Sequence, residues 1–121
     1  MEGAMEADNV WEKIKKSLKD GASMSVEKIE EYTKVGKLKV EEMAAKRKIE
    51  RNFVDIGERV YDLVDEGRNS EVSEDIVIKK AVENVKELRA ELDEIVEKIR
   101  TVPDEVKAAK QENSDEEVTG V

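Results

Sequence analysis

Residues 49–63 read IERNFVDIGERVYDL, and their apolar positions have the spacing of a helix that packs lengthwise on another helix. Successive apolar residues are separated by steps of 4, 3, 4 and 3: Ile49, Phe53, Ile56, Val60 and Leu63. Such steps place side chains on a single stripe of an α-helix. We therefore expect residues 49–63 to supply one half of a helical seam.

A second apolar run supplies the other half of this seam. Its members are separated by alternating steps of 3 and 4: Ile78, Ala81, Val85, Leu88, Leu92, Ile95, Ile99 and Val102. Residues 67–70, GRNS, interrupt the period and predict a turn. Folding there sets Leu63 opposite Ile78 and Ile49 opposite Leu92. The sequence thus predicts an all-α fold, a long antiparallel helical hairpin that resembles a coiled coil and assembles into a bundle.

A short amphipathic helix is predicted before the hairpin, over residues 8–20. Asp8 or Asn9 can cap it, and residues 1–7 are expected to be a disordered leader. One face of the helix is apolar and is flanked by lysines: Trp11, Ile14 and Leu18. After it, residues 21–25 favour a break capped by serine; the alternative is a continuous helix that tolerates Gly21 at about 1 kcal/mol relative to alanine.

A single long helix is predicted from Val26 to about residue 66. Its early apolar positions follow a stripe of their own: Val26, Ile29, Gly36, Val40 and Met43. Leu38 and Ala45 instead begin the stripe that continues into Ile49 and the seam. This drift predicts that the buried face rotates around the helix.

The return helix is expected to begin at a cap provided by Ser70 or Ser73 and to end near Thr101, because Pro103 cannot continue it. The hairpin domain then covers residues 8–102, including the N-terminal helix. Residues 103–121 are expected to form a short helix followed by an acidic disordered tail.

Composition supports elongated helices rather than a globular core, since 44% of the residues are charged and only 3% are aromatic. The net charge of −9 argues against nucleic-acid binding, which depends on an excess of lysine and arginine. The first ten residues lack both a basic and an apolar segment of a secretory signal. A cytoplasmic location is the expectation.

The chain contains no cysteine and no histidine, which removes thiolate chemistry and the commonest general base and metal ligand. Four acidic residues on the return helix lie off the seam, and their carboxylates are expected to face water: Glu91, Asp93, Glu94 and Glu97. We therefore expect no catalytic residue, no metal site and no cofactor, and the chain is not expected to be an enzyme.

A second apolar row lies beside the seam on the long helix: Val54, Gly57, Tyr61 and Val64. The hairpin covers one stripe per helix, and the N-terminal helix spans only about 18 Å, whereas Phe53 lies about 42 Å along the long helix. A second chain can cover the row, giving a homodimer or higher oligomer; the alternative is a monomer with a partly exposed face. The predicted self-association residues are Phe53, Val54, Gly57, Val60, Tyr61 and Val64.

Two charged features have a functional and a structural interpretation. Residues 34–51 carry seven basic and three acidic side chains, which suits an acidic partner or anionic lipid, or simply a solvated face. The helix with Trp11, Ile14 and Leu18 resembles an interfacial membrane anchor. Docking of these three residues on residues 26–40 or on a partner chain is the interpretation we favour.

Three short segments in the first half resemble small, uncharacterised bacterial helical proteins: the Gly-Ala-Ser hinge at 21–23, the Thr-Lys segment at 33–38 and the Ile-Gly-x-x-Val-Tyr motif at 56–61. Many relatives end in a cysteine-rich zinc ribbon, which this cysteine-free chain lacks. The resemblance implies no established activity.

Together these features predict a noncatalytic structural or interaction protein that self-associates and presents charged helix faces to a protein partner. The alternative is a peripheral membrane-associated or stress-related factor that binds anionic lipid through its N-terminal helix.

Overall fold

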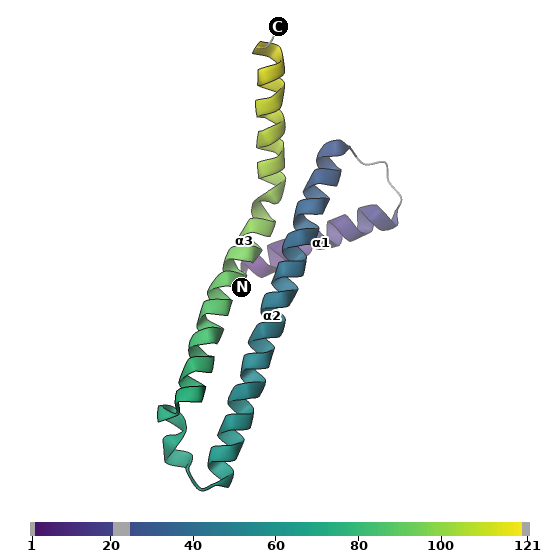
Figure 1. Cartoon of the computed structure of the whole chain (residues 1–121). Coiled ribbons are helices and arrows are strands. Elements are labelled where there is room, and N and C mark those ends of the chain that lie inside the picture. The colour runs from purple at the N-terminus through teal and green to yellow at the C-terminus, as the bar shows by residue number, and fades with distance from the viewer. Residues whose placement is uncertain (1, 21–24, 120–121) are drawn as a thin grey trace. The chain divides into compact units, whose positions relative to one another are not determined.

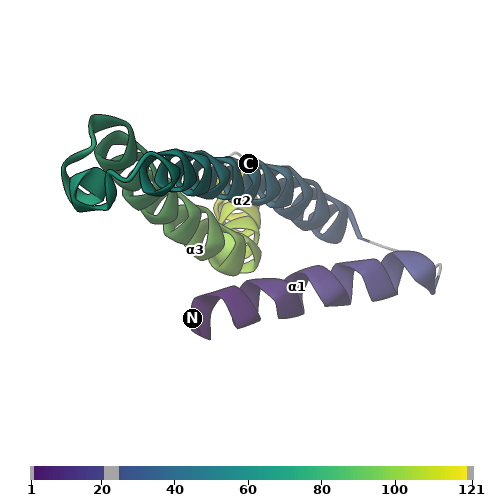
Figure 2. The same ribbon diagram turned by 90° about the horizontal axis from the view of Figure 1, so that it is seen from below.

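The computed structural model describes residues 2–20 and 25–119, and every regular element in this part of the chain is helical. Helix α1 spans Glu2–Lys19, α2 spans Val26–Asp65, the short 3-10 helix η1 spans Asn69–Glu74, and α3 spans Ile76–Thr119. Helices α2 and α3 pack against each other and run in opposite directions (Figure 1; Figure 2). The predicted all-α helical hairpin is therefore confirmed.

The chain divides into two compact units. One contains the residues up to Glu41 together with those from Ile95 onward, and the other contains Glu42–Glu94. The second unit buries six apolar side chains: Ala45, Ile49, Leu63, Ile78, Ala81 and Val85. Among the side chains that the structure describes, the first unit buries seven: Ile14, Val35, Ile95, Val96, Ile99, Val102 and Val106. The predicted seam residues Ile49, Leu63 and Ile78 are thus buried in a single unit.

Phe53 is a correction to the predicted seam. Its side chain is 46% exposed, and the Arg89 guanidinium lies 5.7 Å from the centre of its ring. Asn52 and Arg59 are half-buried instead, and the Asn84 amide lies 3.5 Å from the Asn52 side-chain oxygen. The 4,3 spacing of the seam also fits Asn52 and Arg59. Selecting apolar residues alone therefore assigned Phe53 to the seam in place of the adjacent Asn52.

The predicted rotation of the buried face along α2 is wrong. Val26 is 82% exposed and Val40 is 68% exposed, whereas Val35 is fully buried. The residues that turn inward follow one unbroken 4,3 spacing, called here the inner row: Glu31, Val35, Leu38, Glu42, Ala45, Ile49, Asn52, Ile56, Arg59 and Leu63. Because two of its buried positions are glutamates, Glu31 and Glu42, the inner row cannot be recognised from apolar spacing alone.

These buried glutamates have neighbouring lysines on α2. The Glu31 carboxylate lies 3.6 Å from the Lys28 ammonium group, and the Glu42 carboxylate lies 2.9 Å from that of Lys46. Burial of a carboxylate is costly unless opposite charge or hydrogen bonds compensate. Lysine stems are long enough to bring the ammonium group to a carboxylate that lies beneath the surface.

The hairpin turn follows a known helix-ending geometry. Gly67 has a φ of 75°, its amide donates to the Val64 carbonyl at 3.1 Å, and the Arg68 amide donates to the Leu63 carbonyl at 2.7 Å. This pair of bonds is the Schellman motif, in which glycine adopts the left-handed conformation without steric cost. The predicted turn at residues 67–70 therefore ends α2 where the period breaks.

The predicted serine caps of the return helix are wrong. Residues Asn69–Glu74 form η1, and α3 begins only after Asp75, whose carboxylate accepts a hydrogen bond from the Ile78 amide at 3.1 Å. Aspartate is among the preferred N-cap residues because its carboxylate satisfies an otherwise unpaired helical amide. On α2 the serine cap is confirmed, since the Ser25 hydroxyl accepts from the Lys28 amide at 3.2 Å.

Both outer helix ends differ from the prediction. Helix α1 begins at Glu2, so Asp8 and Asn9 are interior positions and residues 2–7, which were expected to be disordered, are helical. Helix α3 continues through Pro103 to Thr119, which includes most of the predicted disordered tail. Buried Val102 and Val106 flank the proline and hold both sides of it in contact with the unit. The predicted break at 21–25 falls mainly on residues 21–24, which lie outside the described part.

Candidate self-association surface

The residues predicted to mediate self-association are largely exposed. Val54 is 57% exposed, Tyr61 69%, Val64 49% and Phe53 46%. Gly57 is also exposed, and Val60 is half-buried. The structure therefore brings these residues together along one part of α2, in the unit Glu42–Glu94, and leaves all of them except Val60 exposed.

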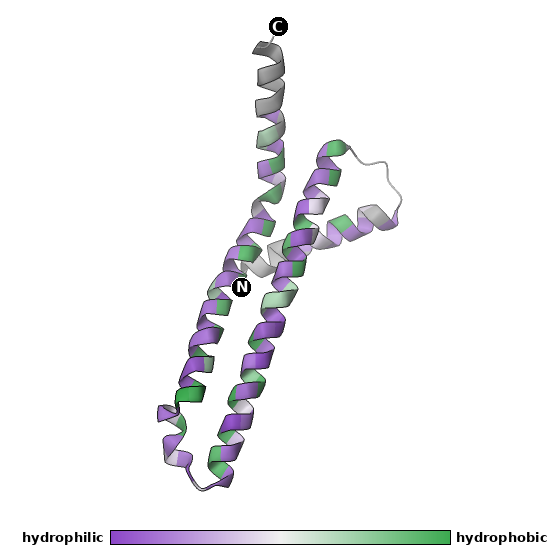
Figure 3. Cartoon of the chain, in the orientation of Figure 1, coloured by the Kyte–Doolittle hydropathy of each residue, from purple (hydrophilic) through white to green (hydrophobic). Residues whose placement is uncertain are grey.

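Seven of the eight exposed large apolar residues of α2, all except Phe53, belong to one continuous row. Its twelve positions are separated by steps of 3 and 4 without a break, and we call them the outer row: Val26, Ile29, Thr33, Gly36, Val40, Met43, Arg47, Glu50, Val54, Gly57, Tyr61 and Val64. Such spacing is the a and d pattern of a coiled coil. Figure 3 shows hydrophobic positions recurring along the whole of α2.

The outer row lies on the side of α2 away from the inner row. Each outer position from Ile29 to Tyr61 precedes an inner one by two residues, as Gly36 precedes Leu38 and Tyr61 precedes Leu63. Two residues correspond to about 200° around a helix. The row predicted from the sequence lay beside the seam and contained only the second half of this surface. The unbroken spacing through Thr33, Arg47 and Glu50 is the signal that identifies the whole row.

Two glycines of the outer row are not packed against any other described part of the chain. A methyl group built on Gly36 or on Gly57 would meet no atom within 4 Å beyond the helix's own backbone and chain neighbours. Glycine in a helix interior costs about 0.5–1 kcal/mol relative to alanine. Their presence on an exposed heptad row suits the close approach of another backbone.

The predicted membrane or partner contact on α1 is only partly available. Ile14 is 2% exposed and Trp11 is half-buried, while the side chain of Leu18 lies outside the described part. The ammonium group of Lys15 lies 5.5 Å from the centre of the Trp11 ring. The apolar face of α1 is therefore at least partly used inside its own unit.

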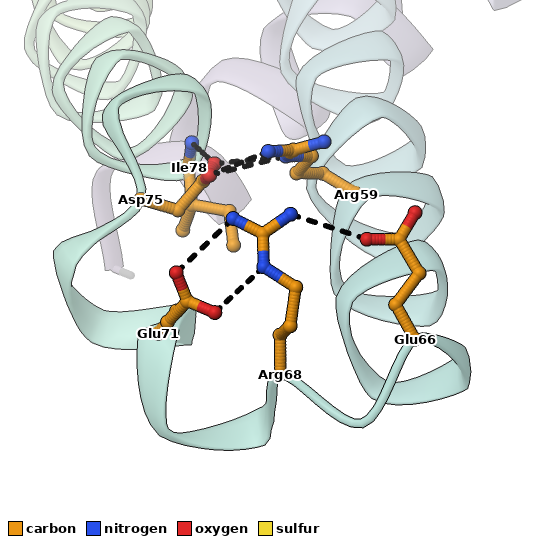
Figure 4. A network of polar contacts seen from close by, with 6 residues as sticks. All are labelled: Arg59, Glu66, Arg68, Glu71, Asp75 and Ile78. Atoms are coloured by element: carbon orange, nitrogen blue, oxygen red, sulfur yellow. Dashed lines mark hydrogen bonds and ion pairs between the residues drawn. The ribbon is translucent and has the colours of Figure 1, made fainter.

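A network of arginine and carboxylate groups lies at the hairpin turn (Figure 4). Arg59 donates two hydrogen bonds to one Asp75 oxygen, at 2.9 and 3.1 Å, and a third at 3.2 Å to the other. Arg68 donates to Glu71 at 2.6 and 3.1 Å and to Glu66 at 3.1 Å. These contacts join the end of α2 to η1 and to the start of α3.

The electrostatics of this network suit structure rather than acid–base chemistry. Hydrogen bonds from Arg59 lower the pKa of Asp75, and the hydrogen bond from the Ile78 amide lowers it further. Hydrogen bonds from Arg68 lower the pKa of Glu71. A general acid or base at neutral pH needs a carboxylate whose pKa is raised instead. Within the described residues, no cluster of acidic side chains is arranged to hold a metal ion.

Asp75→Asn is expected to lower the melting temperature at neutral pH, since the charge-assisted pair with Arg59 is lost while asparagine can still cap α3. Because the pKa of Asp75 is lower in the folded state, its ionised carboxylate stabilises the fold fully at a pH above the ordinary aspartate pKa of about 3.9. This stabilisation is lost as the pH falls through the lower pKa of the folded state.

The difference in melting temperature between wild type and Asp75→Asn should therefore shrink as the pH is lowered from about 7 to about 3. Thermal unfolding followed by circular dichroism measures it. Asp62→Asn is the matched control, because Asp62 is an exposed aspartate of α2. A difference for Asp75→Asn that stays constant over this range would contradict the role given to its ionised carboxylate.

Comparison with protein-family models, with curated proteins and with solved structures found no match for the chain. The resemblance to small bacterial helical proteins stays an expectation. None of the described helices contains a stretch long and apolar enough to cross a membrane.

Proposed function

We propose that this chain is a noncatalytic structural or interaction protein of the cytoplasm that self-associates through the outer row of α2. The observation that carries the proposal is the exposure of large apolar side chains at heptad spacing, with Tyr61 at 69% and Val54 at 57%. An exposed stripe of this spacing is what one helix presents to another, and its burial is favourable by roughly 25 cal/mol per Å² of apolar area.

The surrounding surface supports an interaction role. The charged residues Lys37, Arg51 and Glu58 of α2 are exposed near the outer row, so an apolar strip is bordered by polar groups. This arrangement, an apolar centre with a polar rim, is common to protein interfaces. Once α2 is covered, charged faces of α3 stay accessible to a further protein partner.

Self-association predicts that thermal stability depends on protein concentration. A contact that forms only between folded chains stabilises the folded state by mass action. The melting temperature of the wild type should rise steadily between about 1 and 100 μM protein, a range that brackets ordinary oligomer affinities. Differential scanning calorimetry measures it, and a melting temperature independent of concentration would contradict the proposal.

The membrane alternative has weaker support, because Ile14 on the apolar face of α1 is 2% exposed and is not available to insert into lipid. Co-sedimentation with anionic liposomes, using the wild type and Trp11→Ala, separates the two functions. Binding that depends on Trp11 would favour the lipid-binding role over the one proposed.

A further inference from the structure

We propose, resting on the self-association above, that the partner of the outer row is a second copy of the chain whose α2 runs antiparallel, with the two-fold axis passing between Arg47 and Glu50. The outer row belongs to α2 alone and extends over about 57 Å from Val26 to Val64. In an antiparallel pair of helices, each a position faces a d position of the partner.

The charges at the centre of the row fit this arrangement. Arg47 and Glu50 are exposed, and neither forms an ion pair with any residue that the structure describes. With the axis between them, Arg47 faces the partner's Glu50, and Glu50 faces the partner's Arg47. Two symmetric salt bridges then pair all four of these charges, two from each chain, on an otherwise apolar strip.

Side-chain sizes in the same register are complementary on both sides of the axis. Tyr61 faces the partner's Gly36, so the largest side chain of the row meets a position without one. Val40 faces the partner's Gly57, and Met43 faces the partner's Val54. Gly36 and Gly57 are unpacked within the described part of one chain, and in the dimer each leaves room for a larger residue of the partner.

A parallel pair in register fits poorly. It sets Arg47 against the partner's Arg47 and Glu50 against the partner's Glu50, and like charges at an interface oppose association. It also pairs Tyr61 with Tyr61 and Gly57 with Gly57, which crowds one layer and leaves a void in another.

Helix α1 does not compete for this surface. Although α1 belongs to the same compact unit as the first part of α2, it leaves Val26 82% and Val40 68% exposed. In this register a second α2 covers ten of the twelve outer-row positions, from Thr33 to Val64, and its own outer row is complementary to them. The second copy is therefore the occupant that the observations favour.

Introduced cysteines test the register directly, because the chain has none of its own. Met43→Cys/Val54→Cys in the full chain should form covalent dimers on mild oxidation, since each cysteine faces the other type in the partner. Within one chain the two positions are about 16 Å apart along α2, too far for a disulfide. Both residues are about half exposed, at 48% and 57%, so the folded chain tolerates the changes.

Three controls decide the orientation. Met43→Cys alone and Val54→Cys alone should stay uncrosslinked, and so should Met43→Cys/Val64→Cys, which is out of register by ten residues. Crosslinking of either single variant would show a parallel pair or a two-fold axis at that residue, and crosslinking of the out-of-register variant would show another alignment. Either result overturns the register while leaving self-association intact, whereas a wild type that is monomeric overturns both.

Charge reversal gives an independent readout of the same register. Arg47→Glu and Glu50→Arg should each weaken the dimer at least tenfold, because each places two like-charge pairs across the axis. The double variant Arg47→Glu/Glu50→Arg exchanges the two partners and should restore the affinity to within about threefold of wild type. Additive weakening in the double variant, measured by sedimentation equilibrium, would overturn the proposed contacts.

Discussion

Leu63→Ala is expected to lower the free energy of unfolding by about 2–5 kcal/mol, since the side chain is fully buried and its truncation removes apolar contacts and leaves a cavity. Leu63 is the last inner-row residue before the Schellman turn, and its carbonyl accepts the Arg68 amide. The substitution therefore removes apolar contacts beside the hairpin turn, where the end of α2 packs against the start of α3.

Urea unfolding at one fixed protein concentration measures this effect, because association makes stability depend on concentration. Val82→Ala is a suitable control, since Val82 lies in the same unit and is 40% exposed. Its expected change is within about 0.5 kcal/mol. Equal effects for the two variants would contradict the placement of Leu63 in the core.

Tyr61→Glu is expected to dissociate the oligomer while leaving the helices folded. Tyr61 is 69% exposed within a single chain, so the monomer loses little, but a glutamate in a buried interface places an uncompensated charge there. Loss of an aromatic anchor from an interface costs about 2 kcal/mol or more. Because a symmetric dimer contains the substitution twice, its dissociation constant should rise on the order of a thousandfold.

Lys48→Gln is the matched control for Tyr61→Glu, since it makes the same change in net charge on α2 outside the outer row. The mass of each variant by light scattering, with helicity by circular dichroism, separates dissociation from unfolding. If Tyr61→Glu keeps the mass of the wild type, the outer row is not the interface.

The hairpin could be predicted from the sequence because apolar periodicity and turn chemistry agreed. Ile49, Leu63 and Ile78 carry the seam, and Gly67 is the residue with the positive φ that a Schellman turn requires. The serine at the start of α2 was also foreseeable, since Ser25 directly precedes the first apolar position.

The errors arose where polar residues occupy positions expected to be apolar. Glu31 and Glu42 lie in the buried inner row, so a search for apolar residues followed Val26 and Val40 instead, which are exposed. Only the packing against α3 reveals which of the two rows on α2 turns inward. The exposed row was therefore recognised in part, at Val54, Tyr61 and Val64, and misassigned in the rest.

The end of α3 could not be predicted from local preference alone. Proline disfavours the helix interior by about 3 kcal/mol, yet α3 continues through Pro103 because apolar residues on both sides are buried. Likewise, the capping role of Asp75 depends on η1, whose presence moves the start of α3 beyond both candidate serines. In each case contacts formed by the folded chain override the local signal.

Sedimentation equilibrium of the wild type at micromolar concentration tests self-association most directly. The chain has a mass of 13.7 kDa. The outer row of α2 predicts a species of twice that mass, in reversible equilibrium with the single chain on dilution. A single species of 13.7 kDa throughout the micromolar range would contradict it.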